Sequence, residues 1–300
     1  MLARCRTIGA FVLFAASAAN GSNWVSNFAG SAEDYRVVRD RETIAIEQLM
    51  LLLPGDVVII DRPDGRIVVV DDNNEYRNLA RSDTPFVVPE SKSPPQLLVN
   101  VRSWLSSWWS TRGNQNTSSM AAVSRGGLDP AISAPAAEIN FLLSGARTLH
   151  VAWQGGIAPF DITLFSGTGE ILVHEADLSG NEAILPEVIL LNGQYRLQVS
   201  AGDADNSVAL NVVEKDRLPE AANAILDLDV PAEIGYGHVA MILSAYENWR
   251  FEAFQIANQY KLTQLALDLR TGDFPESEFV ETTSGQNSAE VERPALQDNP

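Results

Sequence analysis

Alternation of apolar and polar side chains is the clearest pattern in this chain, and it is strongest in residues 136–214. Tyr195, Leu197 and Val199 would point to one face of a strand there, and the polar residues between them to the other. Short segments with the same alternation recur between turns rich in Gly, Asn and Asp. These segments are 139–143, 149–153, 160–164, 171–173 and 208–212. The pattern predicts a block of short strands that bury one face each.

About seven short strands spaced by roughly ten residues are typical of a β-sandwich, and this block resembles immunoglobulin and fibronectin type III domains. Trp153 lies where such domains place a core tryptophan. Tyr195 follows Leu-Asn-Gly and resembles the tyrosine-corner position of these domains. The resemblance concerns an architecture and does not by itself fix a function.

Residues 35–90 are expected to form a separate and smaller all-β domain. Their short apolar runs are divided by turns such as Asp64-Gly65, which is a hairpin signal. Segment 44–53 fits either a buried strand or a helix, because it is continuously apolar but rich in helix-forming residues. Residues 35–90 contain Pro-Gly-Asp-Val-Val at 54–58 and Asp-Gly-Arg-Ile-Val-Val-Val at 64–70, and on these motifs they resemble a FecR-like periplasmic β-domain. That resemblance implies an interaction domain of envelope signalling rather than an enzyme.

Residues 96–109 predict an amphipathic helix with several tryptophans on one face. This face has three alternative uses: packing on the protein's own β-domain, docking of a protein partner, or contact with a membrane interface. The polar face has few Lys or Arg residues, which disfavours the membrane alternative. Aromatic side chains are enriched in binding hot spots. The predicted partner-binding residues are Trp104, Leu105, Trp108 and Trp109.

The remaining segments complete a mainly β fold class with a small α-helical C-terminal unit. Residues 110–135 are poor in large apolar residues and predict a flexible linker. From residue 218 the apolar spacing changes to three and four, which predicts a helical hairpin, or two to three helices, over 218–270. This unit is expected to pack on the sandwich. Residues 271–300 are acidic and polar and are expected to be disordered.

The first 19 residues have the composition of a signal peptide. Arg4 and Arg6 precede a short apolar run that ends in a small-residue cleavage pattern at 16–18. The run is shorter than the ~20 residues of a membrane-spanning helix, although retention as an anchor stays an alternative. Cys5, the single cysteine, lies in this leader, so the mature chain would have no disulfide. We therefore expect a periplasmic or secreted bacterial protein.

Charge limits the classes of partner. The formal net charge is −18 at pH 7, which disfavours nucleic acid and anionic membranes because both require clustered Lys and Arg. Membrane contact beyond the leader is therefore not expected. An envelope protein is the expected partner, and a glycan bound by exposed aromatic residues is the alternative.

Metal binding has two candidate sets of residues. His150 and His174 lie on predicted strands, and with Glu175 or Asp177 they would offer metal ligands. Exposed strand histidines without a metal are the simpler interpretation. The loops 71–74 and 203–207 are rich in Asp and Asn but lack the complete calcium-loop pattern, and Asp and Asn are common turn residues. We therefore predict no metal site and no cofactor.

Catalytic motifs are missing from the sequence. It contains no Gly-x-Ser-x-Gly elbow, phosphate-binding loop, dinucleotide fingerprint or His-Glu-x-x-His pair. We therefore expect a non-enzymatic protein–protein interaction protein of the bacterial envelope, with a role in signalling or assembly and no catalytic residues. A hydrolase with a site at a domain junction, where acids and His238 would converge, is the less favoured alternative.

Overall fold

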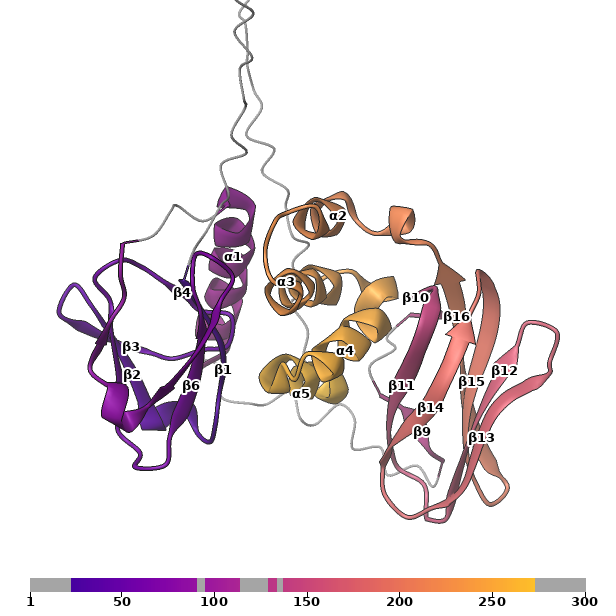
Figure 1. Ribbon diagram of the computed structural model, residues 1–300. Coiled ribbons are helices and arrows are strands. Elements are labelled where there is room, and N and C mark those ends of the chain that lie inside the picture. The colour runs from indigo at the N-terminus through magenta and orange to yellow at the C-terminus, as the bar shows by residue number, and fades with distance from the viewer. Residues whose placement is uncertain (1–22, 91–94, 114–128, 134–136, 273–300) are drawn as a thin grey trace, which may run out of the picture.

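The computed structural model describes residues 23–90, 95–113, 129–133 and 137–272 (Figure 1). It contains an N-terminal β-domain, a long helix, a β-sandwich and a C-terminal helical unit, which confirms the mainly β fold class. Figure 1 shows helices α2–α5 between the two β-domains, with α1 beside the N-terminal domain. The helical unit therefore contacts both β-domains as well as α1. The expected leader and acidic tail lie outside the described residues.

Two four-stranded sheets form the N-terminal β-domain, with strand orders β4-β1-β6-β7 and β3-β2-β5-β8. Small apolar side chains from both sheets, such as Val25, Val37 and Ile67, fill the space between them. The strands are β1 (Asn23–Phe28), β2 (Tyr35–Arg39), β3 (Glu42–Ala45), β4 (Leu51–Leu52), β5 (Val57–Ile60), β6 (Arg66–Val70), β7 (Tyr76–Ala80) and β8 (Phe86–Val87). Strand β1 is central in its sheet, so the predicted start at residue 35 is too late.

Segment 44–53 forms no helix. It contains the end of β3, a turn and the two-residue strand β4. Leu49 adopts a positive φ of 58°, a left-handed conformation that interrupts regular structure. This conformation places the Leu49 side chain in the interior, where it contacts the helical unit. The apolar run is thus explained by burial at a domain junction.

Helix α1 (Gln96–Gly113) begins at the predicted residue and continues past the predicted end at residue 109. The helical unit has four helices where spacing alone predicted two or three. They are α2 (Glu220–Leu226), α3 (Ala232–Ser244), α4 (Arg250–Gln259) and α5 (Thr263–Thr271). Pro219 and Pro231 are the N-cap residues of α2 and α3, where a missing N–H costs no intrahelical hydrogen bond. Helices α2 and α3 therefore begin directly after a proline, whereas α4 follows Trp249 and α5 follows Leu262.

The sandwich consists of a five-stranded sheet, β10-β16-β15-β12-β13, and a three-stranded sheet, β14-β11-β9. Its strands are β9 (Ala131–Ile132), β10 (Ile139–Leu143), β11 (Gly145–Gln154), β12 (Phe160–Ser166), β13 (Ile171–Leu178), β14 (Glu182–Leu190), β15 (Gly193–Ala201) and β16 (Ala204–Val213). Strand β9 lies in the predicted linker 110–135 and pairs with Trp153 and Gln154. The sandwich therefore extends beyond its predicted boundary at residue 136.

Two aromatic residues confirm the immunoglobulin-like interior. Trp153 is buried and packs against Phe160, with their ring centroids 5.2 Å apart. The Tyr195 hydroxyl donates to the Leu191 carbonyl at 2.9 Å and accepts from the Leu191 amide at 3.0 Å. A tyrosine bonded to backbone a few residues upstream is the feature that defines a tyrosine corner.

Candidate functional site

Helix α1 uses part of its apolar face for internal packing. Leu98 and Val101 are fully buried in the core that also contains Trp24 of β1 and residues of α2 and α3. Trp104 is half-buried and packs against the same core. The side chains of Leu105, Trp108 and Trp109 lie outside the described part of the chain. The partner-binding role of these three residues stays a prediction, whereas Trp104 has at least a structural role.

Buried polar bonds join helix α4 to the sandwich. Arg147 of β11 and Glu252 of α4 form an ion pair with N–O distances from 2.9 Å, and Glu252 also accepts from the Leu143 amide. Burial raises the pKa of Glu252, and Arg147 opposes this effect. Gln255 of α4 both accepts from the His150 amide and donates to its carbonyl, at 2.8 and 2.9 Å. The Gln255 side-chain amide thereby satisfies the backbone N–H and C=O of His150 as a neighbouring strand would.

The junction between the N-terminal domain and the helical unit is an apolar contact around His238. The ring of His238 is fully buried and meets Trp24 edge to face, at 5.5 Å between centroids. Its Nδ1 lies 2.7 Å from the Ile234 carbonyl and therefore carries the proton. Burial, with a smaller contribution from the charge of Arg102 on α1, lowers the pKa of His238 to about 4, although the hydrogen bond to Ile234 acts in the opposite direction. A buried neutral histidine of this kind is a packed core residue, not the centre of a cleft.

The residues considered for metal binding do not come together. His150 lies in the three-stranded sheet and His174 in the five-stranded sheet. The exposed His174 ring is 3.0 Å from the Thr163 hydroxyl, and burial lowers the pKa of His150. In the described ranges no group of three or more His, Cys, Asp or Glu residues could hold a metal ion. Asp71 accepts hydrogen bonds from the amides of Asn73 and Glu75, as a turn residue does.

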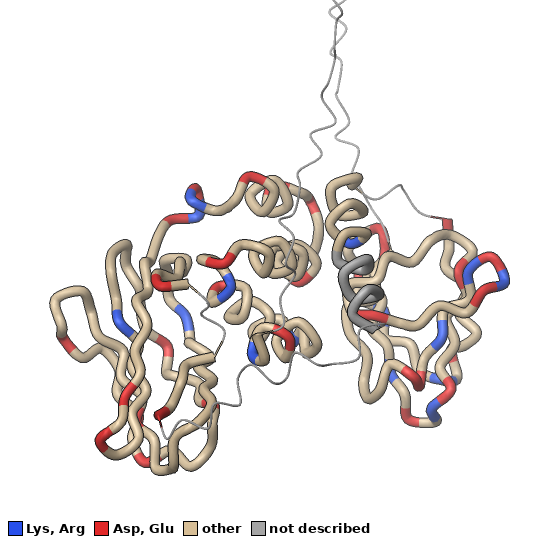
Figure 2. The backbone as a smooth tube through the Cα atoms, turned by 180° about the vertical axis from the view of Figure 1, so that it is seen from behind, with Lys and Arg blue, Asp and Glu red and all other residues tan. Residues whose placement is uncertain are grey.

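Charged residues are distributed over the whole surface. Figure 2 shows acidic positions on both β-domains and on the helical unit, with basic positions between them. On the N-terminal domain many are paired, such as Arg36 with Asp61 and Arg62 with Asp64. Exposed pairs of this kind contribute little to stability, typically about 0–1 kcal/mol. No described helix has the length and apolar composition needed to cross a lipid bilayer.

Strand β14 and the residue after it carry three exposed aliphatic side chains of the sandwich. Ile184 and Ile189 are 62% and 68% exposed, and Leu191, directly after the strand, is 68% exposed. Ile184 pairs with His150 of β11, and Ile189 pairs with Ala146. These two β11 residues are an even number of positions apart, so the two isoleucines lie on the same face of the sheet. We call Ile184, Ile189 and Leu191 the β14 face. The apolar pattern of the sequence does not predict this strand or the face on it.

Comparison with known proteins gives no family. No family model matches the chain, and no curated protein matches it. The FecR-like assignment of residues 35–90 therefore stays a prediction. Among solved structures, the chain is similar to CopC from Methylosinus trichosporium OB3b, with 18% identity over 30% of this chain and 99% of CopC, and a TM-score of 0.24.

Two further solved structures are immunoglobulin-like or surface-layer domains. The titin Ig tandem domains A164-A165 have 13% identity over 61% of this chain and 81% of theirs, with a TM-score of 0.23. Domains 4 and 5 of the S-layer protein SbsC have 13% identity over 62% of this chain and 74% of theirs, with a TM-score of 0.21. The architecture of this protein is thus established from its own strand order, as an immunoglobulin-like β-sandwich with an added β-domain and helical unit.

Proposed function

We propose that this chain is an exported, non-catalytic protein–protein interaction protein of the bacterial envelope, acting in signalling or assembly. The leader-like composition of residues 1–19 supports export. The observation that carries the proposal is the β14 face. Strand β14 and its end expose three large aliphatic side chains, and Ile184 and Ile189 share one face of the sheet. Exposed apolar residues grouped on one element can mark an interaction site.

The position of the β14 face fits a docking surface. Helix α4 covers strand β10 and the free side of β11, whereas β14 is an edge strand of the three-stranded sheet and contacts α5 through the ion pair between Glu182 and Arg270. Pro186 interrupts β14 at a register shift and removes one backbone donor from the edge. Pairing with a foreign strand is thereby disfavoured. The partner therefore contacts the side chains of the β14 face with an apolar surface of its own, rather than extending the sheet.

Affinity capture from a native envelope fraction tests this function. The bait is the chain from residue 21 onward, and its variant carries Ile184→Lys with Ile189→Lys. Both side chains point into solvent, so we expect the variant to fold with an unchanged melting temperature. Two buried lysines at the interface would abolish capture, because desolvating an unpaired charge is costly. The matched control is Ile157→Lys, at a 70% exposed isoleucine in the loop between β11 and β12.

The proposal requires a protein that the wild type and the Ile157→Lys variant retain and the double variant loses. Identical sets of captured proteins for all three baits would refute the role of the β14 face. Capture of no protein by any of them would refute the interaction function itself.

A further inference from the structure

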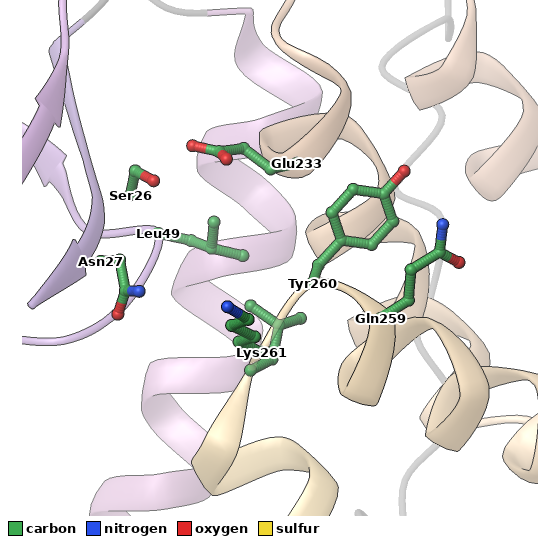
Figure 3. Close-up of a pocket in the computed structure, with 8 residues that line it drawn as sticks. Ser26, Asn27, Leu49, Glu233, Gln259, Tyr260 and Lys261 are labelled. Carbon is green, nitrogen blue, oxygen red and sulfur yellow. The ribbon is translucent and has the colours of Figure 1, made fainter. Parts of the chain in front are cut away.

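A small pocket lies where the N-terminal β-domain meets the helical unit, and it belongs to neither the β14 face nor the α1 stripe. Its volume is about 260 Å³. The β-domain contributes Ser26 and Asn27 of β1 together with Leu49, and the helical unit contributes Glu233, Tyr260 and Lys261. Figure 3 shows the Glu233 carboxylate at one side and the Lys261 ammonium at the other, with Leu49 between them. We call this cavity the junction pocket.

Glu233 and Lys261 both line the pocket without neutralising each other. Among the described residues neither takes part in an ion pair. The Glu233 Oε1 atom is buried and has no hydrogen-bond partner within the described chain. A buried carboxylate oxygen normally has a hydrogen-bond partner. Glu233 therefore brings an uncompensated negative charge to the wall of the pocket.

The aromatic residues beside Glu233 favour a positively charged donor. Tyr260 lines the pocket and stacks on Tyr236, with centroids 5.4 Å apart and an angle of 10° between the rings. Aromatic faces attract ammonium groups. Burial, the neighbouring Tyr236 and the negative charge of Glu233 all raise the pKa of Tyr260, so the phenol stays neutral. A cation at Glu233 would find a carboxylate and an aromatic side chain together.

Lys261 is held in place at the opposite side. Its backbone is left-handed, with a φ of 56°, a conformation that is strained for a residue with a side chain. The Gln48 side chain of the β-domain stabilises it by donating to the Lys261 carbonyl at 3.0 Å. The same amide accepts from the Thr263 amide at 3.2 Å. The two domains are thus bonded to each other at Lys261, which lines the pocket.

We infer that the junction pocket binds a small zwitterion, an unbranched amino acid with its ammonium on Glu233 and its carboxylate on Lys261. The volume admits a molecule of this size and excludes a drug-sized ligand, whose pockets measure about 300–1,000 Å³. A single charge would leave one of the two protein charges unpaired. Because the ligand touches both domains, its binding would also stabilise the junction.

Isothermal titration calorimetry of the full chain tests this assignment with five probes. Glycine, β-alanine and γ-aminobutyrate carry both charges at increasing separation, whereas ethylamine and acetate carry one charge each. We expect one zwitterion to bind at least about tenfold more tightly than either singly charged probe. We also expect this zwitterion to raise the melting temperature of the chain.

Two variants separate the charges. Glu233→Gln and Lys261→Gln keep size and polarity, and each is expected to weaken binding of the zwitterion about tenfold or more. Glu220→Gln is the matched control, because Glu220 also lies in the first turn of a helix, α2, but does not line the pocket. It should bind like the wild type.

Three results would overturn the inference. The first is that no zwitterion gives measurable heat at about 10 mM, which would mean that any affinity is weaker than millimolar. The second is binding that both pocket variants leave unchanged. The third is that only Glu233→Gln weakens binding and that the wild type binds ethylamine as tightly as the zwitterion. That result would show a pocket for cations instead.

Discussion

Protonation of His238 should loosen the junction between the N-terminal domain and the helical unit. The buried ring has a pKa of about 4, against 6.5 for the free side chain. Because the folded-state pKa is the lower one, the unfolded chain binds the proton first as the pH falls. Stability is therefore full above about pH 6.5 and is lost progressively toward pH 4. At 1.36 kcal/mol per pKa unit, the loss between pH 7 and pH 4.5 is roughly 2.5 kcal/mol.

Urea denaturation followed by tryptophan fluorescence measures this loss, since Trp24 contacts the His238 ring. The informative variant is His238→Leu, which keeps an apolar side chain of similar length and removes the titration. We expect its stability to fall by about 2 kcal/mol less than that of the wild type between the two pH values. His174→Leu is the control, because His174 is exposed, and it should follow the wild type.

Equal acid-induced losses in the wild type and in His238→Leu would refute the reasoning. That result would mean that the imidazole is hydrated in solution and that the junction is open at neutral pH. The nearest charged group to act on His238 is Arg102 of α1, which pairs with Glu47 at 2.8 Å. An open junction would place this pair differently relative to the ring.

Two further substitutions test the packing of the helical unit. Gly237→Ala would place a Cβ 2.4 Å from a methyl of the buried Leu49 and should lower the free energy of unfolding by about 1–3 kcal/mol. In Gly235→Ala the nearest atom to the Cβ is 3.5 Å away, so this change should raise the free energy of unfolding by about 0.5–1 kcal/mol. Similar melting temperatures for the two variants would contradict this junction. Glu252→Ala leaves the Arg147 charge unpaired and should cost about 3–5 kcal/mol by denaturant titration. Glu182→Ala breaks an exposed ion pair and should cost at most about 1 kcal/mol, and an equal effect of both would count against a buried pair.

The strands that alternate strictly could be predicted from the sequence, because each buries one face and exposes the other. Strand β14 could not. Pro186 lies in its middle, a register shift changes its parity, and Ile184 and Ile189 point outward. A pattern that equates apolar with buried misreads such a strand. The features that hid β14 are also those that make its face a candidate docking site.

Contacts between domains were even less accessible to sequence reasoning. Leu49 contacts Gly237, which lies 188 residues further along the chain of 300. The left-handed backbone at Leu49 interrupts regular structure, so no periodic apolar pattern predicts this contact. The junction pocket combines Asn27, Glu233 and Lys261 from separate elements. Local periodicity sets which face of an element is buried, but not which distant element covers it.

Photo-crosslinking in cells tests the central claim most directly. A benzoylphenylalanine replaces Ile189 in the β14 face or, as the control, the equally exposed Ile157. If the protein acts as an interaction protein of the envelope through this face, irradiation will give one discrete crosslinked partner from position 189 and none from position 157. The same crosslinks from both positions, or none from position 189, would contradict the account.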